Sequence, residues 1–380
     1  MNAPRFHAFL FRRSIRVASL LVMSSLALSV PSPGLAASRA QADPGGVIHE
    51  PVAERIDSAM AALAELGVTG TLLVERDGKV ILHKGYGVVN RSTHARATTT
   101  TPYLLGSLSK QFTAAAAYRL QSQGKLQLSD SLPHWFDNVP PDKQGITVEQ
   151  LIHHTSGLPY LGHGDLYDSM SVDSMVRETM AYRLDLQPGT QYEYSSPGYD
   201  LLARIVERAS GVPFNQYLRR FLFDPAGMSS TGFADEPSRW PPARRTPSYS
   251  DAGNQPDPPL YPVALAPKIV GSGSVVSTAG DLWSWEQALR THRVLDAAAT
   301  EAYFQPGPVR TPAGGYAGGW QVVKSQRNTN VILHAGDIGG FNTDMRRLVD
   351  EHATIIFLSN GREGGRGYRE VVPILATRIL

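Results

Sequence analysis

One serine and one lysine have a spacing that suits nucleophilic catalysis. Ser107 and Lys110 are three residues apart at a predicted helix start. Residues at i and i+3 share one helix face, so the lysine ammonium can lie beside the serine hydroxyl. The positive potential of a helix N-terminus favours an oxyanion formed there. Because serine is a weak nucleophile without a neighbouring base or cation, the pair is a candidate acyl-transfer centre.

The spacing alone is not specific, because the chain carries it twice. Ser122 and Lys125 match it too, but Gly124 lies between them at a predicted helix end, where the helix dipole has the opposite sign. His153 and His154 could suggest a metal site. Adjacent helical residues point about 100° apart, and no acidic residue or histidine follows at i+3 or i+4, so we interpret the two histidines as a helix-ending turn.

Elements at the two chain ends are predicted to form the sheet. Apolar residues at helical spacing predict a helix over 51–66. Two β-rich runs follow, Gly70–Arg76 and Lys79–Tyr86, and the Asp77-Gly78 dipeptide between them predicts a hairpin. Near the C-terminus, strands are predicted at 320–324, 330–334, 344–349 and 353–358, and a final helix at 369–380.

The middle of the chain is predicted to be rich in helices. One helix begins near Ser107 and ends at Gly124, a second begins at a Thr147/Gln150 capping box, and a third covers 201–209, opened by Ser196 or Pro197 and closed by Gly211. Thr278 and Asp281 form another capping-box pattern. Residues 237–267 contain nine prolines and little periodicity, so we expect a long loop there.

This order of elements predicts an α/β fold of the α+β type. Short links between strands favour an antiparallel sheet over a βαβ series. We expect one sheet built from both chain ends and flanked by helices, with a mostly helical lobe inserted. The predicted catalytic domain is 43–380, with 43–100 and 270–380 in the sheet lobe and 101–269 in the helical lobe, which contains the proline-rich loop.

Composition excludes several classes of protein. The chain of 380 residues is 42% hydrophobic and 18% charged, which argues against a disordered chain. It has no cysteine, so it has no disulfide framework, thiolate metal site or cysteine nucleophile. Residues 1–42 hold five arginines and no acidic residue, whereas the remainder has 31 basic and 34 acidic residues. This balance does not favour a nucleic-acid partner.

The first segment has the pattern of a secretory signal. Arg12, Arg13 and Arg16 precede an apolar run over 17–30, followed by prolines and small residues. We expect cleavage near Ala42 and a secreted or periplasmic protein without an integral membrane segment after signal removal. An uncleaved interfacial anchor is the alternative, because a run of about 14 residues is too short to span a bilayer.

Several motifs in order resemble one known family. Residues 103–114, around Ser107 and Lys110, resemble the nucleophile motif of the serine β-lactamase and penicillin-binding-protein superfamily, closest to its class C β-lactamase-like branch, which also includes esterases and D-amino-acid peptidases. Residues 151–159 resemble its His-Thr-Ser-Gly-Leu loop and 188–199 its Tyr-Ser-Asn segment. His334-Ala-Gly336 is similar to its third motif, Lys-Thr-Gly or His-x-Gly. The matches cover nearly the whole mature chain.

The resemblance implies a β-lactamase/transpeptidase-like fold and a role for each matching residue. Ser107 would form an acyl-enzyme, Lys110 would lower neighbouring proton affinities and help shuttle a proton, and Tyr194 would be the general base. The backbone amides of Ser107 and Asp337 would form the oxyanion hole. Neither a cofactor nor a metal is implied. Without the resemblance, Tyr194 would be interpreted as an ordinary packed tyrosine.

Two departures from the family pattern bear on the substrate. Ser196 replaces the asparagine of the Tyr-x-Asn triplet and is shorter, which weakens a contact to a substrate amide. His334 places a titrating imidazole where the family has a fixed cation for a carboxylate. Ser196, His334 and Gly336 are the predicted substrate-binding residues, with a solvent-facing His334 as the alternative. Gly336 would let a substrate backbone approach the strand.

The expected function is an exported serine hydrolase. Its partners would be small-molecule or peptide substrates: esters, amides, D-amino-acid or peptidoglycan stem peptides, or β-lactams. The two departures favour an esterase or D-peptidase over an efficient β-lactamase. The alternative is a module on the same scaffold that binds peptidoglycan fragments or a partner without turnover. We also expect loop 237–267 to form one wall of the substrate cleft.

Overall fold

The computed structural model describes residues 46–160, 169–250, 255–257, 266–311, 313–363 and 366–367. The chain divides into two compact units, Met1–Gln41 and Ala42–Leu380, and all described residues belong to the second. The predicted signal segment 1–42 and the predicted final helix 369–380 lie outside the described residues.

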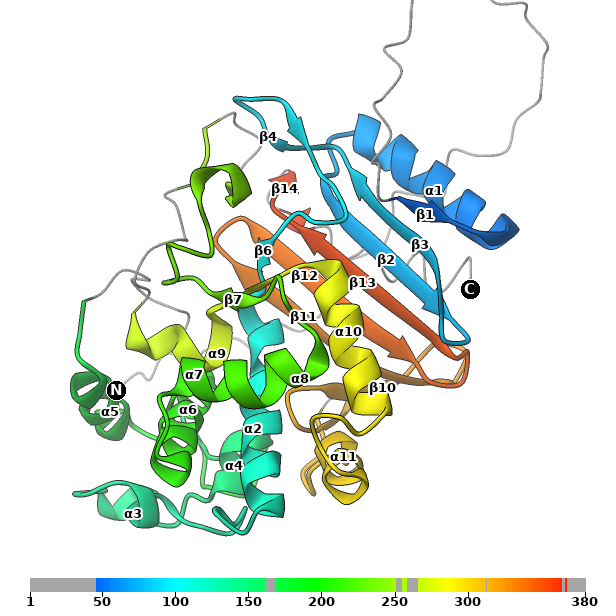
Figure 1. Cartoon of the computed structure of the whole chain (residues 1–380). Helices are drawn as coiled ribbons and strands as arrows, with labels where there is room; N and C mark the ends of the chain where they lie inside the picture. The colour runs from blue at the N-terminus through cyan, green and yellow to red at the C-terminus, as the bar shows by residue number, and fades with distance from the viewer. Residues whose placement is uncertain are drawn as a thin grey trace, which may run out of the picture. The chain divides into compact units, whose positions relative to one another are not determined.

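An eight-stranded antiparallel sheet is built from both chain ends, as predicted (Figure 1). Its order is β1-β3-β2-β13-β12-β11-β10-β9, so β2 near the N-terminus pairs directly with β13 near the C-terminus. The bounds are β1 Val47–Ile48, β2 Gly70–Arg76, β3 Lys79–Tyr86, β9 Gly314–Tyr316, β10 Gln321–Lys324, β11 Asn330–Ile338, β12 Phe341–Leu348 and β13 Ala353–Ser359.

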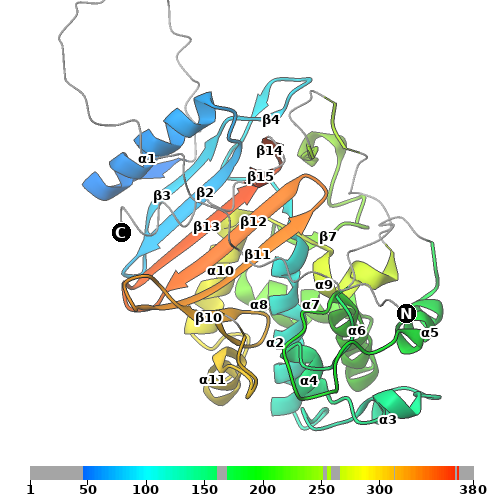
Figure 2. The same ribbon diagram turned by 180° about the vertical axis from the view of Figure 1, so that it is seen from behind.

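Helices cover the two faces of this sheet because its strands are apolar on both sides. Helix α1 (Glu50–Glu65) buries Ile56 and Met60 in one core with Leu72 of β2. Leu73 points to the opposite face and joins the larger core, which includes helix α10 (Ala279–Arg290) and the helical lobe. Figures 1 and 2 show α1 and α10 on opposite sides of the sheet.

The helical lobe follows β6 and surrounds helices α2 and α6. Its helices are η1 Gly106–Ser109, α2 Lys110–Ser122, α3 Leu132–Trp135, η2 Pro141–Lys143, α4 Val148–Ile152, α5 Val172–Ala181, α6 Ser196–Ser210, α7 Phe214–Leu218, the π-helix η3 Arg219–Phe223, α8 Asp224–Ala226, η4 Pro242–Arg244, η5 Pro267–Ile269 and α9 Val270–Gly273. Helix α11 (Ala297–Phe304) lies later in the chain.

Short strands connect the lobe to the main sheet. Strands β6 (Tyr103–Leu104), β8 (Val275–Ser277) and β7 (Gly232–Phe233) form a three-stranded sheet directly before the Ser107 segment. Two two-stranded sheets pair β4 (Val88–Asn90) with β5 (Ala95–Arg96), and β14 (Arg362–Glu363) with β15 (Arg366–Gly367). Among helices of the described ranges, none has both the length and the apolar composition needed to cross a membrane.

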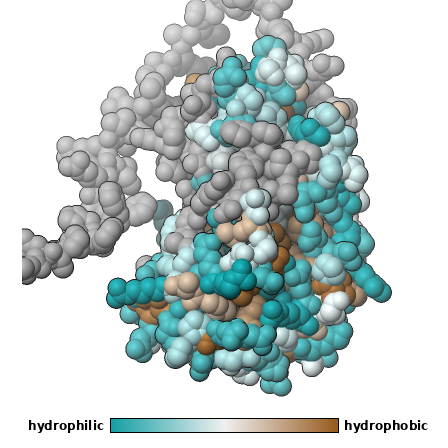
Figure 3. Space-filling model, turned by 90° about the vertical axis from the view of Figure 1, so that its left-hand side faces the viewer, coloured by the Kyte–Doolittle hydropathy of each residue, from teal (hydrophilic) through white to brown (hydrophobic). Residues whose placement is uncertain are grey.

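The surface seen from the side of α3 and α5 is mainly hydrophilic among the described residues (Figure 3). Hydrophobic residues form small patches on this face rather than one continuous area. Tyr160, which is 60% exposed, is one of the large hydrophobic side chains that remain open to solvent. Such scattered exposure is ordinary for a folded domain.

Candidate active site

The backbone around Ser107 is fixed by a tight turn against the small sheet. Gly106, the first residue of η1, has a φ of +54°, which favours glycine. The amide of Leu105 donates to the carbonyl of Val275 at 2.8 Å, and the Val275 amide donates to Ser109 Oγ at 3.1 Å. These bonds hold Ser107, with its side chain partly exposed, in the 3-10 turn η1 that leads directly into α2, so the predicted helix start is a 3-10 turn and the α-helix begins at Lys110.

Lys110 lies directly beside the Ser107 hydroxyl. Its Nζ donates to Ser107 Oγ at 3.1 Å, to Ser196 Oγ at 3.4 Å and to the Ser272 carbonyl at 3.0 Å. The lysine is 0% exposed, and burial lowers its pKa to about 7. A substantial fraction of this amine is therefore neutral near neutral pH, and its lone pair can accept a proton.

Tyr194 completes the group of three predicted catalytic side chains. It lies just before α6, the Ser107 side chain acts to lower its pKa against the larger effect of burial, and its ring centroid is 4.9 Å from Lys110 Nζ. Burial raises the pKa of the Tyr194 phenol above its usual range. The hydroxyl consequently stays protonated at neutral pH and can donate that proton.

Strand β11 packs closely against the turn that carries Ser107. A Cβ atom on Gly336 would lie 1.9 Å from the Leu105 carbonyl oxygen, and one on Gly106 would lie 2.9 Å from the Asp337 nitrogen. Thr343 Oγ1 of β12 donates to that same Leu105 carbonyl at 2.8 Å. The Asp337 backbone nitrogen thus lies next to the turn that carries Ser107.

His334 is buried and neutral, in contrast to the titrating imidazole predicted from the sequence. Its Nδ1 lies 2.7 Å from the Ala335 carbonyl, which can only accept, so Nδ1 carries the proton. Its Nε2 therefore accepts from the Tyr316 hydroxyl at 3.0 Å. Burial and the nearby Lys110 lower the His334 pKa to about 3. With 3% exposure, it is also not the solvent-facing histidine of the alternative interpretation.

Ser196 faces the lysine. It is the first residue of α6 and is buried, and its hydroxyl is within 3.4 Å of Lys110 Nζ. Ser196 opens the helix as predicted, and the helix cap comes from Ser195, whose Oγ accepts the Gly198 amide. Ser196 therefore helps to orient the lysine amine.

His154 is a residue whose part in the site the sequence analysis missed. It lies in the turn after α4 with a φ of +55°, so the predicted helix-ending turn is confirmed. Its Nδ1 accepts the Ser195 amide at 3.0 Å, and its ring centroid is 4.3 Å from that of Tyr194. Burial keeps its pKa well below the usual range. A neutral His154 thus holds both the ring and the following backbone of Tyr194.

His153 makes a separate contact on the other side of the turn. Its Nδ1 is 2.8 Å from the Tyr316 carbonyl. Within the described ranges, no group of three or more histidine, aspartate or glutamate side chains could hold a metal ion.

Asp200 is a second buried group that the sequence did not reveal. It lies on α6, and its carboxylate accepts the backbone amides of Gly271 and Ser272, each at 3.0 Å. Polar residues within an amphipathic helix pattern are expected to face solvent, so only the tertiary structure shows this contact with α9.

The proline-rich loop reaches the end of β11. The Tyr249 amide donates to the Asn360 carbonyl at 2.9 Å, and a Cβ on Gly340 would lie 2.3 Å from the Tyr249 nitrogen. Gly340 follows β11 in the turn to β12. The loop is not wholly irregular, since Pro242–Arg244 forms the 3-10 turn η4. Residues 251–254 and 258–265 of this loop lie outside the described residues.

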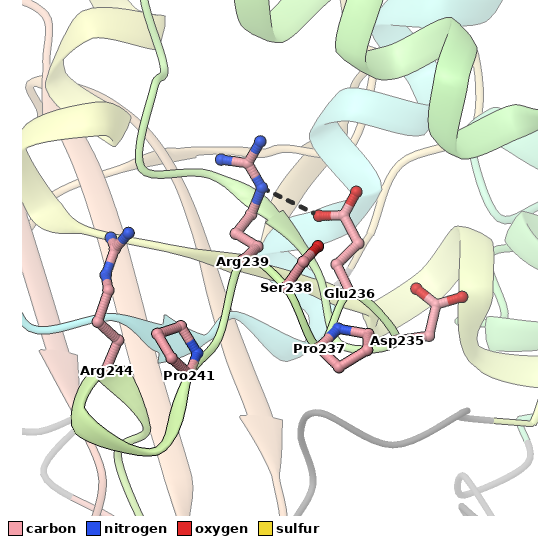
Figure 4. Close-up of a pocket in the computed structure, with 7 residues that line it drawn as sticks. All are labelled: Asp235, Glu236, Pro237, Ser238, Arg239, Pro241 and Arg244. Carbon is pink, nitrogen blue, oxygen red and sulfur yellow. Dashed lines mark ion pairs between the residues drawn. The ribbon is translucent and has the colours of Figure 1, made fainter.

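A cavity of about 590 Å³ opens where this loop begins (Figure 4). Glu236 and Arg239 form an ion pair of 3.2 Å in its wall, so the opposite charges largely compensate each other. None of the predicted catalytic residues lines it. Its described lining is Asp235, Glu236, Pro237, Ser238, Arg239, Pro241 and Arg244.

Comparison with known proteins identifies the family and the fold. The chain matches the Beta-lactamase family over residues 52–374. It is 30% identical over 333 residues to penicillin-binding protein 4* of Bacillus subtilis, covering 82% of this chain and 72% of that protein. A D-amino acid amidase structure from Ochrobactrum anthropi has a TM-score of 0.73 at 22% identity, covering 86% of this chain and 98% of that one.

A penicillin-binding protein structure from Bacillus halodurans has a TM-score of 0.72 at 23% identity, covering 87% of this chain and 99% of that chain. At these identities the solved structures support the fold, and the family match rests on the sequence comparisons. The chain therefore belongs to the β-lactamase family and has the fold of the serine β-lactamase and penicillin-binding-protein superfamily.

Proposed function

We propose that the protein is a serine hydrolase that forms an acyl-enzyme on Ser107 and cleaves esters or amides. The carrying observation is the fully buried Lys110, whose amine lies 3.1 Å from the Ser107 hydroxyl and loses its proton near neutral pH. Maintaining a lysine without solvent exposure is costly for a fold. A catalytic role accounts for that cost better than a structural one.

The geometry supports a definite path for each proton during acylation. Neutral Lys110 accepts the Ser107 proton as Oγ attacks the carbonyl carbon, and the amides of Ser107 and Asp337 stabilise the oxyanion. As the intermediate collapses, Tyr194 donates its proton to the leaving alcohol or amine and regains one from Lys110. Water then attacks the carbonyl carbon of the Ser107 ester. One proton of this water returns to Ser107 Oγ, and the carboxylic acid product is released.

This path divides the roles differently from the family-based assignment, in which Tyr194 is the base. A general base works best when its pKa lies near the working pH. Burial lowers the pKa of Lys110 to about 7 and raises the pKa of Tyr194 above its usual range. We therefore assign proton acceptance to Lys110 and proton donation to Tyr194.

The third motif favours substrates that lack a carboxylate beside the scissile bond. Both His334 ring nitrogens are used, by Ala335 and Tyr316, and burial keeps the ring neutral. Ser196 is engaged with Lys110. Neither residue offers a charge or a carboxamide to a β-lactam. Esters, D-amino-acid amides and peptides cleaved away from their C-terminal carboxylate suit such a site better, and the fold shared with a D-amino acid amidase supports this class.

The test compares initial rates on p-nitrophenyl butyrate, D-phenylalanine amide and a chromogenic cephalosporin. Purified protein is measured beside its Ser107→Ala variant. We expect turnover of the ester or the amide that disappears with Ser107, together with slow or no cephalosporin hydrolysis. Rapid cephalosporin hydrolysis would contradict the substrate class, and equal rates in the Ser107→Ala protein would contradict the mechanism.

A binding module without turnover is the second candidate function. It would bind peptidoglycan fragments in the same site, and binding would persist in the Ser107→Ala variant. The intact group of Ser107, Lys110 and Tyr194 favours the enzyme.

We also propose export, supported by the arginines and apolar run within 12–30. Purification from culture medium or periplasm, with an N-terminus near residue 43, would verify it.

A further inference from the structure

Asp200 is a buried titratable group to which the proposed reaction path assigns no role. It is 1% exposed and lies on α6, six residues after Tyr194. Besides the two backbone amides, its carboxylate accepts the Ser272 hydroxyl at 3.2 Å. Since the Gly271 amide, the Ser272 amide and the Ser272 hydroxyl all donate, they fit an ionised carboxylate.

The backbone that Asp200 holds is the backbone that holds Lys110. The Ser272 amide donates to Asp200, and the carbonyl of the same residue accepts from Lys110 Nζ at 3.0 Å. Thr113, on α2 one turn after the lysine, donates to the Gly271 carbonyl at 2.6 Å. Ser272 therefore links the Asp200 carboxylate to the Lys110 amine.

The other groups around the lysine do not carry a compensating charge. The rings of Tyr194 and Tyr199 lie 4.9 and 5.7 Å from Lys110 Nζ. His154 and His334 face it from the α4 turn and from β11, and burial lowers the pKa of both imidazoles, which keeps them neutral.

Asp200 supplies the opposing charge. Its carboxylate raises the pKa of Lys110, against the larger lowering effect of burial. Burial raises the pKa of the Asp200 carboxyl to about 7, while Lys110, the hydrogen bonds from Ser272 and Gly271, and the Arg204 charge one turn further along α6 oppose that rise and favour the ionised form. The carboxylate thus acts on the lysine in two ways, through the Ser272 backbone and through its charge.

We propose that Asp200 is a positioning residue that places the Lys110 amine beside Ser107 and sets the pH at which that amine accepts the serine proton. The proposal rests on the proposed function of this site. It adds a charged residue that acts on the catalytic centre through Lys110, although Asp200 itself contacts neither the substrate nor Ser107.

The test uses Asp200→Asn in the full chain. An asparagine can still accept both amides through Oδ1 and can donate to Ser272 Oγ, so the substitution removes mainly the charge. The readout is the rate at which a fluorophosphonate labels Ser107, followed by intact mass across pH. In the wild-type protein the rate rises with pH as Lys110 loses its proton. We expect the midpoint to move about one pH unit or more lower in Asp200→Asn.

Thr113→Val is the matched control. It removes a hydrogen bond to the same α9 backbone without changing charge, so we expect a lower labelling rate at an unchanged midpoint. An Asp200→Asn midpoint equal to that of the wild type would overturn the proposal. If Asp200→Asn does not fold, Ser272→Ala replaces it, and a smaller shift in the same direction is expected because the hydroxyl favours ionised Asp200. An unshifted midpoint in that variant would equally overturn the proposal.

Labelling separates this proposal from the proposed function. A wild-type protein that labels on Ser107 but hydrolyses neither ester nor amide would refute turnover while the midpoint comparison still decides the role of Asp200. A wild-type protein that is not labelled at any pH would refute the nucleophile itself, and the proposal about Asp200 would be overturned with it.

Discussion

Replacing Gly336 with alanine tests whether β11 contributes half of the oxyanion hole. Its φ is not in the left-handed region, so the added methyl group meets only a steric obstacle. That Cβ would lie 1.9 Å from the Leu105 carbonyl oxygen, whereas ordinary van der Waals contact begins at 3.4 Å. The strand and the Ser107 turn must separate by up to 1.5 Å, the difference between these distances.

A separation of this size would break a hydrogen bond from Asp337 to the oxyanion, which needs about 2.7–3.1 Å between heavy atoms. Losing one oxyanion-hole donor costs about 10²–10³ in kcat, or ~2.7–4 kcal/mol. The assay is kcat on p-nitrophenyl butyrate, normalised to the folded fraction measured by thermal melting.

Gly85→Ala is the matched control. Gly85 lies on β3, a different strand of the same sheet from Gly336, and a Cβ there would lie 2.1 Å from the Ala97 carbonyl oxygen. It should lower the melting temperature while kcat per folded molecule stays within about threefold of wild type. If Gly336→Ala retained wild-type kcat, or lost no more than Gly85→Ala after normalisation, the assignment of Asp337 would be wrong.

Three further predictions concern the proton path and the histidine that supports Tyr194. The value of kcat/KM should rise as pH passes about 7, because Lys110 must lose its proton, and then stay level past about pH 9, because Tyr194 keeps its proton there; an activity maximum on the acid side of neutrality would contradict this. Tyr194→Phe should lose about 10²–10⁴ in kcat on an amide but much less on a p-nitrophenyl ester, whose leaving group needs no proton. Equal losses would make Tyr194 the base. His154→Asn can keep the acceptor for Ser195 and tolerate the positive φ, so its melting temperature should exceed that of His154→Phe, which leaves the buried amide unpaired at a cost of about 1–3 kcal/mol; the reverse order would refute this role.

The sequence predicted the elements that local chemistry decides. Asp77 and Gly78 both have positive φ values, as the hairpin turn between β2 and β3 requires. Thr147 and Gln150 form both hydrogen bonds of the predicted capping box. Gly211 ends α6 with a φ of +69°. In these cases the interacting groups are neighbours in sequence, so the pattern contains the whole interaction.

Prediction was less accurate where a residue serves a distant contact. The strand predicted to end at His334 continues to Ile338, and Gly336 within it packs closely against the Leu105 carbonyl of the Ser107 turn. Asp281 donates its amide to Thr278 as predicted, but its carboxylate accepts from Thr231 instead of closing the box.

The proximity of Ser107 and Lys110 was predictable because their motif is local, and Tyr194 was assigned to the same group through the family resemblance. The residues that support this group were not predictable. Asp200 reaches Ser272 across 72 positions, and Lys110 reaches the same residue across 162. Burial of a polar side chain depends on what packs over it, and a single sequence does not show that packing.

The most direct measurement of the central claim is mass spectrometry of the acyl-enzyme. Purified protein is mixed with p-nitrophenyl butyrate, quenched with acid during turnover and digested. We expect one butyryl group on the peptide that contains Ser107, and no such adduct in the Ser107→Ala variant. Ester hydrolysis with no trapped adduct on that peptide, or with an adduct on a different residue, would contradict the assignment of Ser107 as the nucleophile.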